Sequence, residues 1–194
     1  IQKYGKTFFT ESVKREIIQM YGLESLYERG LVVNLSLNEK LQTAAEASFR
    51  KGIIKYDRRH GWRGPLGSIE VNAILENRWR EPLTQIVRPE GAKEYDIAVV
   101  FEIQKDQATI GFKNGHKGYI QLEQLKWARK RLQNQTLGPV VKDVAQVFHK
   151  GDVILVKSLN GDKYYTLEQV PDVNGGMVVL QPRSGKVLAM VGGY

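Results

Sequence analysis

Five stretches between residues 95 and 169 alternate apolar and polar positions in the manner of β-strands. They cover residues 95–104, 107–112, 117–121, 153–158 and 163–169. Asn114–Gly115 joins the second stretch to the third, and both residue types tolerate the positive φ angles of a tight hairpin turn. An apolar pattern over residues 141–148 predicts a helical link before the fourth strand. Three strands, a helical link and two further strands predict a small closed β-barrel.

The chain before this region predicts two helices and a strand. Apolar residues at helical spacing mark amphipathic helices over residues 10–21 and 39–56, and Asn38 is a suitable N-cap for the second helix. Between the helices, residues 31–37 carry leucine or valine at every second position, as a strand with one buried face would.

A hairpin is predicted at the other end of the chain, over residues 177–180 and 186–191. A two-stranded hairpin is marginal by itself, so we expect it to pair with the strand at residues 31–37. The expected fold class is therefore α+β. A central five-stranded barrel with the strand order of an OB-fold is flanked by a linker of helices and a strand, and by the C-terminal hairpin.

The composition is that of an ordinary globular protein. The 194 residues are 42% hydrophobic and 26% charged, which fits one or two domains. The longest aliphatic or aromatic run, Ile97–Phe101, is far shorter than the roughly 20 residues that span a bilayer. The sequence has no cysteine, which excludes disulfides and thiolate chemistry. The net charge of +8 is spread almost evenly along the chain, so we interpret it as a mildly basic surface rather than a polyanion groove.

Aromatic and basic residues are interleaved over residues 55–65, a pattern that is also found on nucleic-acid platforms. The position of this segment favours a structural role. Its basic residues fall at the C-terminal end of a predicted helix, where cations complement the helix dipole, and glycines and a proline then break the chain. We therefore predict a junction between domains, formed by Arg58, Arg59, His60 and Trp62.

Both ends of the chain resemble class A (bifunctional) penicillin-binding proteins. Residues 56–65, Tyr-Asp-Arg-Arg-His-Gly-Trp-Arg-Gly-Pro, together with residues 21–37 and 41–46, are similar to the linker between the two enzymatic modules of that family. Residues 170–194, which end in Leu-Ala-Met-Val-Gly-Gly-Tyr, resemble the first hairpin of its transpeptidase domain. The resemblance covers most of the chain in the family's order, while the middle is similar mainly as a fold.

The resemblance implies a linker at residues 1–80, an inserted OB-like domain at residues 81–169 and the start of a transpeptidase domain at residues 170–194. It implies that the whole protein is a peptidoglycan glycosyltransferase and serine-type DD-transpeptidase that binds penicillin. Such a protein works at the periplasmic face of the bacterial inner membrane, and its N-terminal anchor would be missing from this sequence. The implied partners are the other domains of the synthase and an outer-membrane lipoprotein activator.

The residues themselves indicate no catalytic site. The family's nucleophile is the serine of an S-x-x-K motif, which we expect beyond residue 194, and its S-x-N and K-T-G motifs are absent. Ser48 begins a matching string, but it lies within a predicted amphipathic helix without a neighbouring base or a second motif. His60, His116 and His149 lack a second ligand at zinc-binding spacing. We predict no catalytic residue, metal or cofactor in this sequence.

Two functions from different classes fit such a barrel. The first is a non-catalytic regulatory or docking part of a peptidoglycan synthase. Its candidate partner-binding residues combine aromatic rings and guanidinium groups, which commonly anchor interfaces: Tyr119, Trp127, Arg129 and Arg131. Trp127 has the alternative role of an apolar plug of the barrel.

The second function is the binding of single-stranded nucleic acid, in which bases stack on outward-facing aromatic residues of the second and third strands. Phe112 shares its face with Ala108 and Ile110, so we expect it to point into the core. Only Tyr119 is left to face outward, and nucleic acid is therefore the disfavoured partner.

Overall fold

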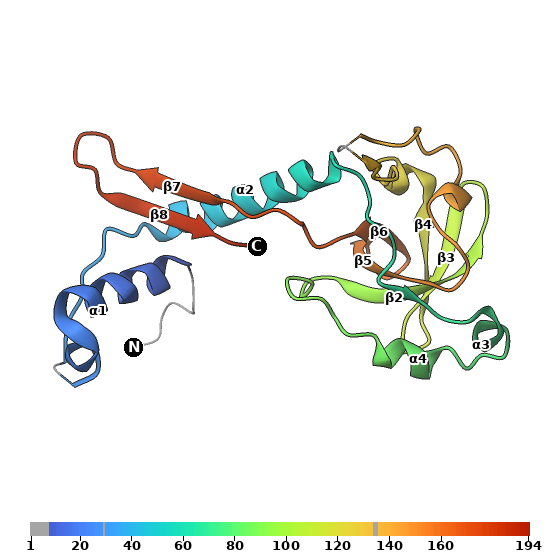
Figure 1. The fold of residues 1–194 in the computed structure, drawn as a ribbon, viewed down its shortest axis with the longest axis horizontal. Helices are drawn as coiled ribbons and strands as arrows, with labels where there is room; N and C mark the ends of the chain where they lie inside the picture. The colour runs from blue at the N-terminus through green and yellow to red at the C-terminus, as the bar shows by residue number, and fades with distance from the viewer. Residues whose placement is uncertain (1–7, 29, 134–135) are drawn as a thin grey trace. The chain divides into compact units, whose positions relative to one another are not determined.

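The computed structural model describes residues 8–28, 30–133 and 136–194 (Figure 1). These residues form two compact units. The first unit holds the described residues up to Lys55 together with Asp172–Tyr194, and the second unit, which we call the barrel unit, holds Tyr56–Pro171.

The first unit contains helices α1 (Phe8–Glu28) and α2 (Glu39–Arg58, whose last three residues belong to the barrel unit) and strands β7 (Gly176–Leu180) and β8 (Val187–Gly192). Figure 1 shows the β7–β8 hairpin alongside α2. Ala45 and Phe49 of α2 pack on Ala189 and Val191 of β8. Asn38 caps α2 as predicted, because its side-chain oxygen accepts a hydrogen bond of 3.1 Å from the Leu41 amide.

The N-terminal helix differs from its predicted bounds. It begins at Phe8 and runs to Glu28, past the expected end at residue 21. Gly22 interrupts it with φ 78° and ψ 163°, a backbone conformation that is accessible mainly to glycine. The helix end predicted at Gly22 is therefore a kink, after which a further helical segment runs to Glu28.

The predicted strand at residues 31–37 is wrong, and so is its pairing with the hairpin. Residues 30–38 have no strand geometry, and β7 and β8 form a two-stranded sheet. The segment meets β8 through one backbone hydrogen bond, from the Asn38 amide to the Leu188 carbonyl (2.8 Å), and through the Ser36 hydroxyl, which donates to the Val187 carbonyl (2.6 Å). An alternating sequence supplies two faces, but a strand also needs a partner for its backbone groups, and here only the end of the segment has one.

The barrel unit confirms the expected fold class and the five predicted strands. They are β2 (Asp96–Ile103), β3 (Gln107–Gly111), β4 (Lys117–Gln121), β5 (Asp152–Asn160) and β6 (Tyr164–Glu168). The order β5–β2–β3–β4–β6 is closed by pairing of β5 with β6, and β4 pairs with β6 in parallel while the other neighbours are antiparallel. This is a closed OB-like barrel.

Shorter elements complete the unit. They are β1 (Gly67–Ser68), α3 (Val71–Leu75), α4 (Arg80–Gln85) and the 3-10 turns η1 (Leu122–Leu125) and η3 (Val144–Gln146). The predicted helical link at residues 141–148 is reduced to the three residues of η3. A capping box closes its N-terminal end: the Asp143 carboxylate accepts from the Ala145 amide, and the Gln146 side chain accepts from the Asp143 amide. Strand β1 adds to the free edge of β5 by pairing Gly67 with Val153.

The barrel unit has two larger apolar clusters and a smaller one formed by Ala92, Tyr95 and Leu155. The inner cluster includes fully buried Ile110, Ile120 and Leu167 from three strands, and Phe112 packs within it as predicted. A second cluster lies on the other side of β2, where Trp79 contacts Phe101 edge-on with ring centroids 4.8 Å apart. Strand β2 is therefore covered on both faces.

Candidate interaction site

The end of α2 is attached to the end of β6 by buried charge. Asp57 is only 2% exposed, and its carboxylate accepts hydrogen bonds from Arg63 Nη1 (2.7 Å), from Arg63 Nη2 (3.2 Å) and from Gln169 Nε2 (2.7 Å). The Gln169 amide also donates to the Gly61 carbonyl (3.0 Å), and its oxygen accepts from the Arg63 amide (3.2 Å). These bonds hold residues 57–63 in one loop conformation against the barrel.

Arg58 forms a second attachment one residue later. Its Nη2 donates to the carboxylate of Glu168 (2.7 Å) and to the Leu167 carbonyl (3.2 Å). Its guanidinium carbon lies 4.7 Å from the centroid of the Trp127 ring, within the range of a cation–π contact. Arg58 Nε and Trp127 Nε1 are both buried, and neither makes a hydrogen bond within the described residues.

Two other predicted junction residues stay at the rim of this cluster. Arg59 is exposed and lies over the ring of Tyr56, 5.2 Å from its centroid. His60 Nδ1 is 3.0 Å from the Tyr56 carbonyl oxygen, and the two rings are 4.6 Å apart.

Trp62 and the basic segment Lys126–Arg131 are brought together. The Trp62 amide donates to the Arg129 carbonyl (2.9 Å), and the backbone at Trp62 forms a parallel bridge with Lys130. The Trp62 ring is buried in the inner cluster, edge-on to Phe148. The sequence hypotheses placed Trp62 and Arg129 in separate groups, whereas the structure pairs their backbones.

Arg129 and Arg131 have different surroundings. Arg129 is half-buried, and its Nε donates to the Gly138 carbonyl at 2.7 Å, so this side chain supports a neighbouring loop. Arg131 is exposed, like Lys130, and both line a surface groove of about 600 Å³ together with Arg63 and His149. We call Trp127, Lys130, Arg131 and the stacked Arg58 the basic patch.

Trp127 is half-buried and packs against the inner cluster, as its alternative role as a barrel plug predicted. Tyr119 lies elsewhere, on β4. Its ring contacts Tyr164 of β6, with centroids 6.3 Å apart, rather than any residue of the basic patch. The four candidate partner-binding residues therefore do not form one surface.

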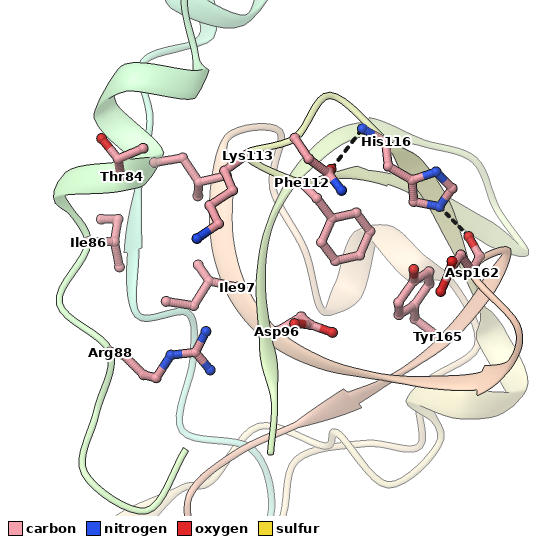
Figure 2. Close-up of a pocket in the computed structure, with 12 residues that line it drawn as sticks. Thr84, Ile86, Arg88, Asp96, Ile97, Phe112, Lys113, His116, Asp162 and Tyr165 are labelled. Carbon is pink, nitrogen blue, oxygen red and sulfur yellow. Dashed lines mark hydrogen bonds between the residues drawn. The ribbon is translucent and has the colours of Figure 1, made fainter. Parts of the chain in front are cut away.

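A pocket of about 490 Å³, which we call the barrel-end pocket, is lined by residues of α4, β2 and the β3–β4 and β5–β6 turns (Figure 2). Phe112 and Tyr165 meet in it with ring centroids 4.8 Å apart, and the His116 ring stacks on Phe112. Asp96 and Asp162 contribute carboxylates to the pocket, and Arg88 and Lys113 contribute cations.

The electrostatics of this pocket act on Tyr165, which is 4% exposed. Burial is the main cause that raises the pKa of its phenol above the ordinary value of 10.0, and the nearby carboxylates of Asp162 and Asp96 raise it further. The phenol is therefore a neutral hydrogen-bonding group at every physiological pH.

Several residues that define these sites are not predicted as site residues from the sequence: Asp57, Arg63, Tyr164, Glu168 and Gln169. Asp57 is the one acidic residue within the basic segment at residues 55–65, which was the available signal for an internal ion pair. The pairing of β6 residues with that segment has no signal at all in the local pattern, because more than a hundred residues separate the partners.

The candidate serine is at the surface of α2. Ser48 is exposed, and no hydrogen bond joins its hydroxyl to a base among the described residues. Across the part of the chain that the structure describes, no helix has the length and apolar character to cross a membrane.

Comparison with known proteins gives consistent results. The sequence profile of the penicillin-binding protein OB-like domain matches residues 62–173. Penicillin-binding protein 1A of Rickettsia bellii is 37% identical over 188 residues, which are 96% of this chain and 22% of that relative. Penicillin-binding protein 1A of Escherichia coli is 31% identical over 194 residues, 98% of this chain and 22% of that relative.

A solved structure agrees with these relatives. The crystal structure of penicillin-binding protein 1A from Haemophilus influenzae matches with a TM-score of 0.59 and 25% identity, over 94% of this chain and 25% of that one. The chain thus spans less than a quarter of the length of the curated relatives it matches. The resemblance to class A penicillin-binding proteins is confirmed, and the chain belongs to the penicillin-binding protein family that carries this OB-like domain.

Proposed function

We propose that this chain is a non-catalytic docking and regulatory part of a peptidoglycan synthase. The synthase would carry glycosyltransferase and DD-transpeptidase activities and would work at the periplasmic face of the inner membrane. The domain boundaries at residues 80/81 and 169/170 stay predictions within this proposal. The partners are the other domains of the synthase and an outer-membrane lipoprotein activator.

The observation that carries the proposal is the basic patch. Arg58 is fixed by Glu168 and stacks on Trp127, so a large aromatic surface is held rigid at the edge of the barrel. Lys130 and Arg131 follow Trp127 by three and four positions in the chain, are exposed, and line a groove of about 600 Å³. Rigid aromatic residues and arginines with exposed cations around them are typical of interface anchors, because little side-chain entropy remains to be lost on binding.

The experiment measures binding of the purified chain to purified outer-membrane lipoproteins of the same cell. Arg131→Glu reverses an exposed charge, and we expect it to weaken binding of the activator by about tenfold or more, since like charges across an interface are strongly unfavourable. Lys142→Glu, an exposed charge outside the groove, is the control and should leave the affinity unchanged. Equal affinities of the unchanged chain and the Arg131→Glu variant would contradict the proposal.

Nucleic-acid binding stays the alternative, and one observation favours it. Tyr119 and Tyr164 form an aromatic pair on β4 and β6, and the Lys163 ammonium lies 5.3 Å from the Tyr164 ring centroid. Against it, Phe112 is committed to the core, so the outward face of β3 offers no stacking ring. A titration of single-stranded RNA at increasing salt separates the two functions, because phosphate contacts produce a steep loss of affinity with salt.

A further inference from the structure

We propose that the barrel-end pocket binds a short peptide that carries both a free ammonium group and a free carboxylate. Its volume of about 490 Å³ falls within the range of roughly 300–1,000 Å³ that is usual for small-ligand sites. The pocket shares no residue with the basic patch, so it is a separate site on the same barrel unit.

Opposite charges line opposite sides of this pocket. Figure 2 shows the side chains of Lys113 and Arg88 on one side of the Phe112 ring, with Asp162 and Tyr165 on the other side. The carboxylates of Asp96 and Asp162 line the same pocket as the Tyr165 phenol. A ligand with a positive and a negative group at its two ends matches this separation of charge.

The polar groups are available to a ligand. Within the described residues, no ion pair engages the carboxylates of Asp96 and Asp162 or the Lys113 ammonium. Arg88 donates from Nη1 to the carbonyls of Ala92 (2.9 Å) and Tyr95, which fixes the guanidinium at the rim of the pocket. Its remaining N–H groups are suited to a carboxylate.

The wall between the charges is rigid and apolar. Phe112 is packed between Tyr165 and the stacked His116 ring, and His116 Nε2 contacts the Asp162 carbonyl across the two turns. The His116 amide donates to Asn114 Oδ1 at 3.0 Å, which holds the β3–β4 turn in place. A preformed site of this kind loses little conformational entropy when a ligand binds.

The charge distribution disfavours ligands of a single sign. A nucleic-acid strand would be repelled by Asp96 and Asp162, and a polyamine would be repelled by Arg88 and Lys113. Uncross-linked peptides of peptidoglycan that end in a diamino acid carry an amine and a carboxylate together. The choice of such a peptide as a probe rests on the proposed function. The charge pattern of the pocket is observed independently of that function.

The test is isothermal titration of the whole chain with three probes. The first is an N-acetylated tripeptide of alanine, γ-linked D-glutamate and meso-diaminopimelate. The second has its side-chain amine acetylated. The third has D-isoglutamine in place of D-glutamate and lysine amide in place of diaminopimelate, so it keeps the side-chain amine and has no free carboxylate. We expect the first probe to bind about twofold to fivefold more tightly than either of the others for each ion pair that it gains.

Variants locate the binding. Asp162→Asn should weaken binding of the first probe by about twofold to fivefold and leave binding of the acetylated probe unchanged. Lys113→Gln should weaken binding of the first probe by a similar factor and leave binding of the third probe, which lacks the carboxylates, unchanged. Asp106→Asn and Lys105→Gln are exposed control variants outside the pocket and should change neither. No binding, equal affinity for all three probes, or equal effects of the control variants would overturn the proposal.

Failure of this site and failure of the docking proposal are distinguishable. Arg131→Glu should leave the peptide affinity unchanged, and Lys113→Gln should leave the lipoprotein affinity unchanged, because the two sites share no lining residue. Each proposal therefore has its own readout and its own contradicting result.

Discussion

Arg63 forms two hydrogen bonds to the Asp57 carboxylate, from Nη1 to Oδ1 at 2.7 Å and from Nη2 to Oδ2 at 3.2 Å. The partners are six positions apart in the sequence, and between them the chain turns at Gly61 with φ 86°. A Cβ at Gly61 would lie 2.6 Å from the Arg129 carbonyl oxygen, so the turn is also packed closely against the segment that carries the basic patch. The ion pair thus fixes the loop that supports the proposed docking surface.

Asp57→Asn should destabilise the barrel unit. The substitution leaves the Arg63 guanidinium without its charged partner, and Asp57 is almost fully buried. Removing one partner of a fully buried ion pair costs about 3–5 kcal/mol. We expect a smaller loss of about 2–3 kcal/mol in the free energy of unfolding, below that range, because the Arg63 side chain keeps 26% exposure and is partly solvated.

Urea unfolding followed by tryptophan fluorescence measures this loss. All three tryptophans, Trp62, Trp79 and Trp127, belong to the barrel unit, so the signal reports this unit. Asp106→Asn removes an exposed carboxylate in the β2–β3 turn and is the matched control, with an expected change within about 0.5 kcal/mol. An unfolding midpoint of Asp57→Asn equal to that of the control would show that the ion pair contributes no stability.

A double-mutant cycle tests the attachment of Arg58 to Glu168. Arg58→Ala removes the ion pair and the stack on Trp127, while Glu168→Ala removes the ion pair and leaves the stack in place. Hydrogen bonds to charged groups contribute about 1.5–3 kcal/mol, so we expect a coupling energy of about 1–2 kcal/mol at the 29% exposure of the Arg58 side chain. Arg58→Ala should also change the Trp127 fluorescence, whereas Glu168→Ala should change it less. Strictly additive effects of the two substitutions would contradict this coupling.

The parts of the fold that the sequence predicted are those governed by local patterns. The five barrel strands follow from alternation, and the Asn114–Gly115 turn follows from residue type, since Gly115 adopts φ 85°. Strand β1 consists only of Gly67–Ser68, and two residues carry no periodicity to detect. Residues 31–37 have the alternation of a strand but lack a partner edge, which is a property of the neighbours rather than of the segment.

The candidate sites depended even more on distant partners. Residue types alone grouped Tyr119 with Trp127, although Tyr119 contacts Tyr164 across β4 and β6. Arg58 lies near the start of the barrel unit and Trp127 near its middle, 69 positions apart in sequence, so their contact depends on the tertiary fold. Spacing along the chain cannot encode such contacts, because they are set by the tertiary pairing of strands.

Gly111→Ala tests the close packing of β3 on β2. A Cβ at position 111 would lie 1.9 Å from Phe101 Cε2, which is far inside van der Waals contact. Overpacking of a core typically costs about 1–3 kcal/mol, and we expect a decrease of that size in the free energy of unfolding, measured by urea titration. Gly67→Ala is the matched control in a strand, because its Cβ would meet only Ile86 at an ordinary 3.8 Å. Combining Phe101→Leu with Gly111→Ala should restore part of the lost free energy of unfolding, because the smaller side chain makes room for the new Cβ. If none is restored, the contact with Phe101 is not the cause of the loss.

The Tyr165 phenol predicts a dependence of stability on alkaline pH. Its pKa in the folded protein is raised above the ordinary value of 10.0 by burial first, and then by Asp162 and Asp96. The folded state therefore binds this proton more tightly than the unfolded state. The resulting stability is fully present below the ordinary phenol pKa and is lost as the pH rises from there through the folded pKa. Difference absorbance of phenolate should show a tyrosine that ionises above the ordinary phenol pKa of 10.0, and Tyr165→Phe should remove it. Asp162→Asn should lower this midpoint only in part, because the phenol stays buried. A midpoint at the ordinary value in the unchanged chain would contradict a buried phenol flanked by carboxylates.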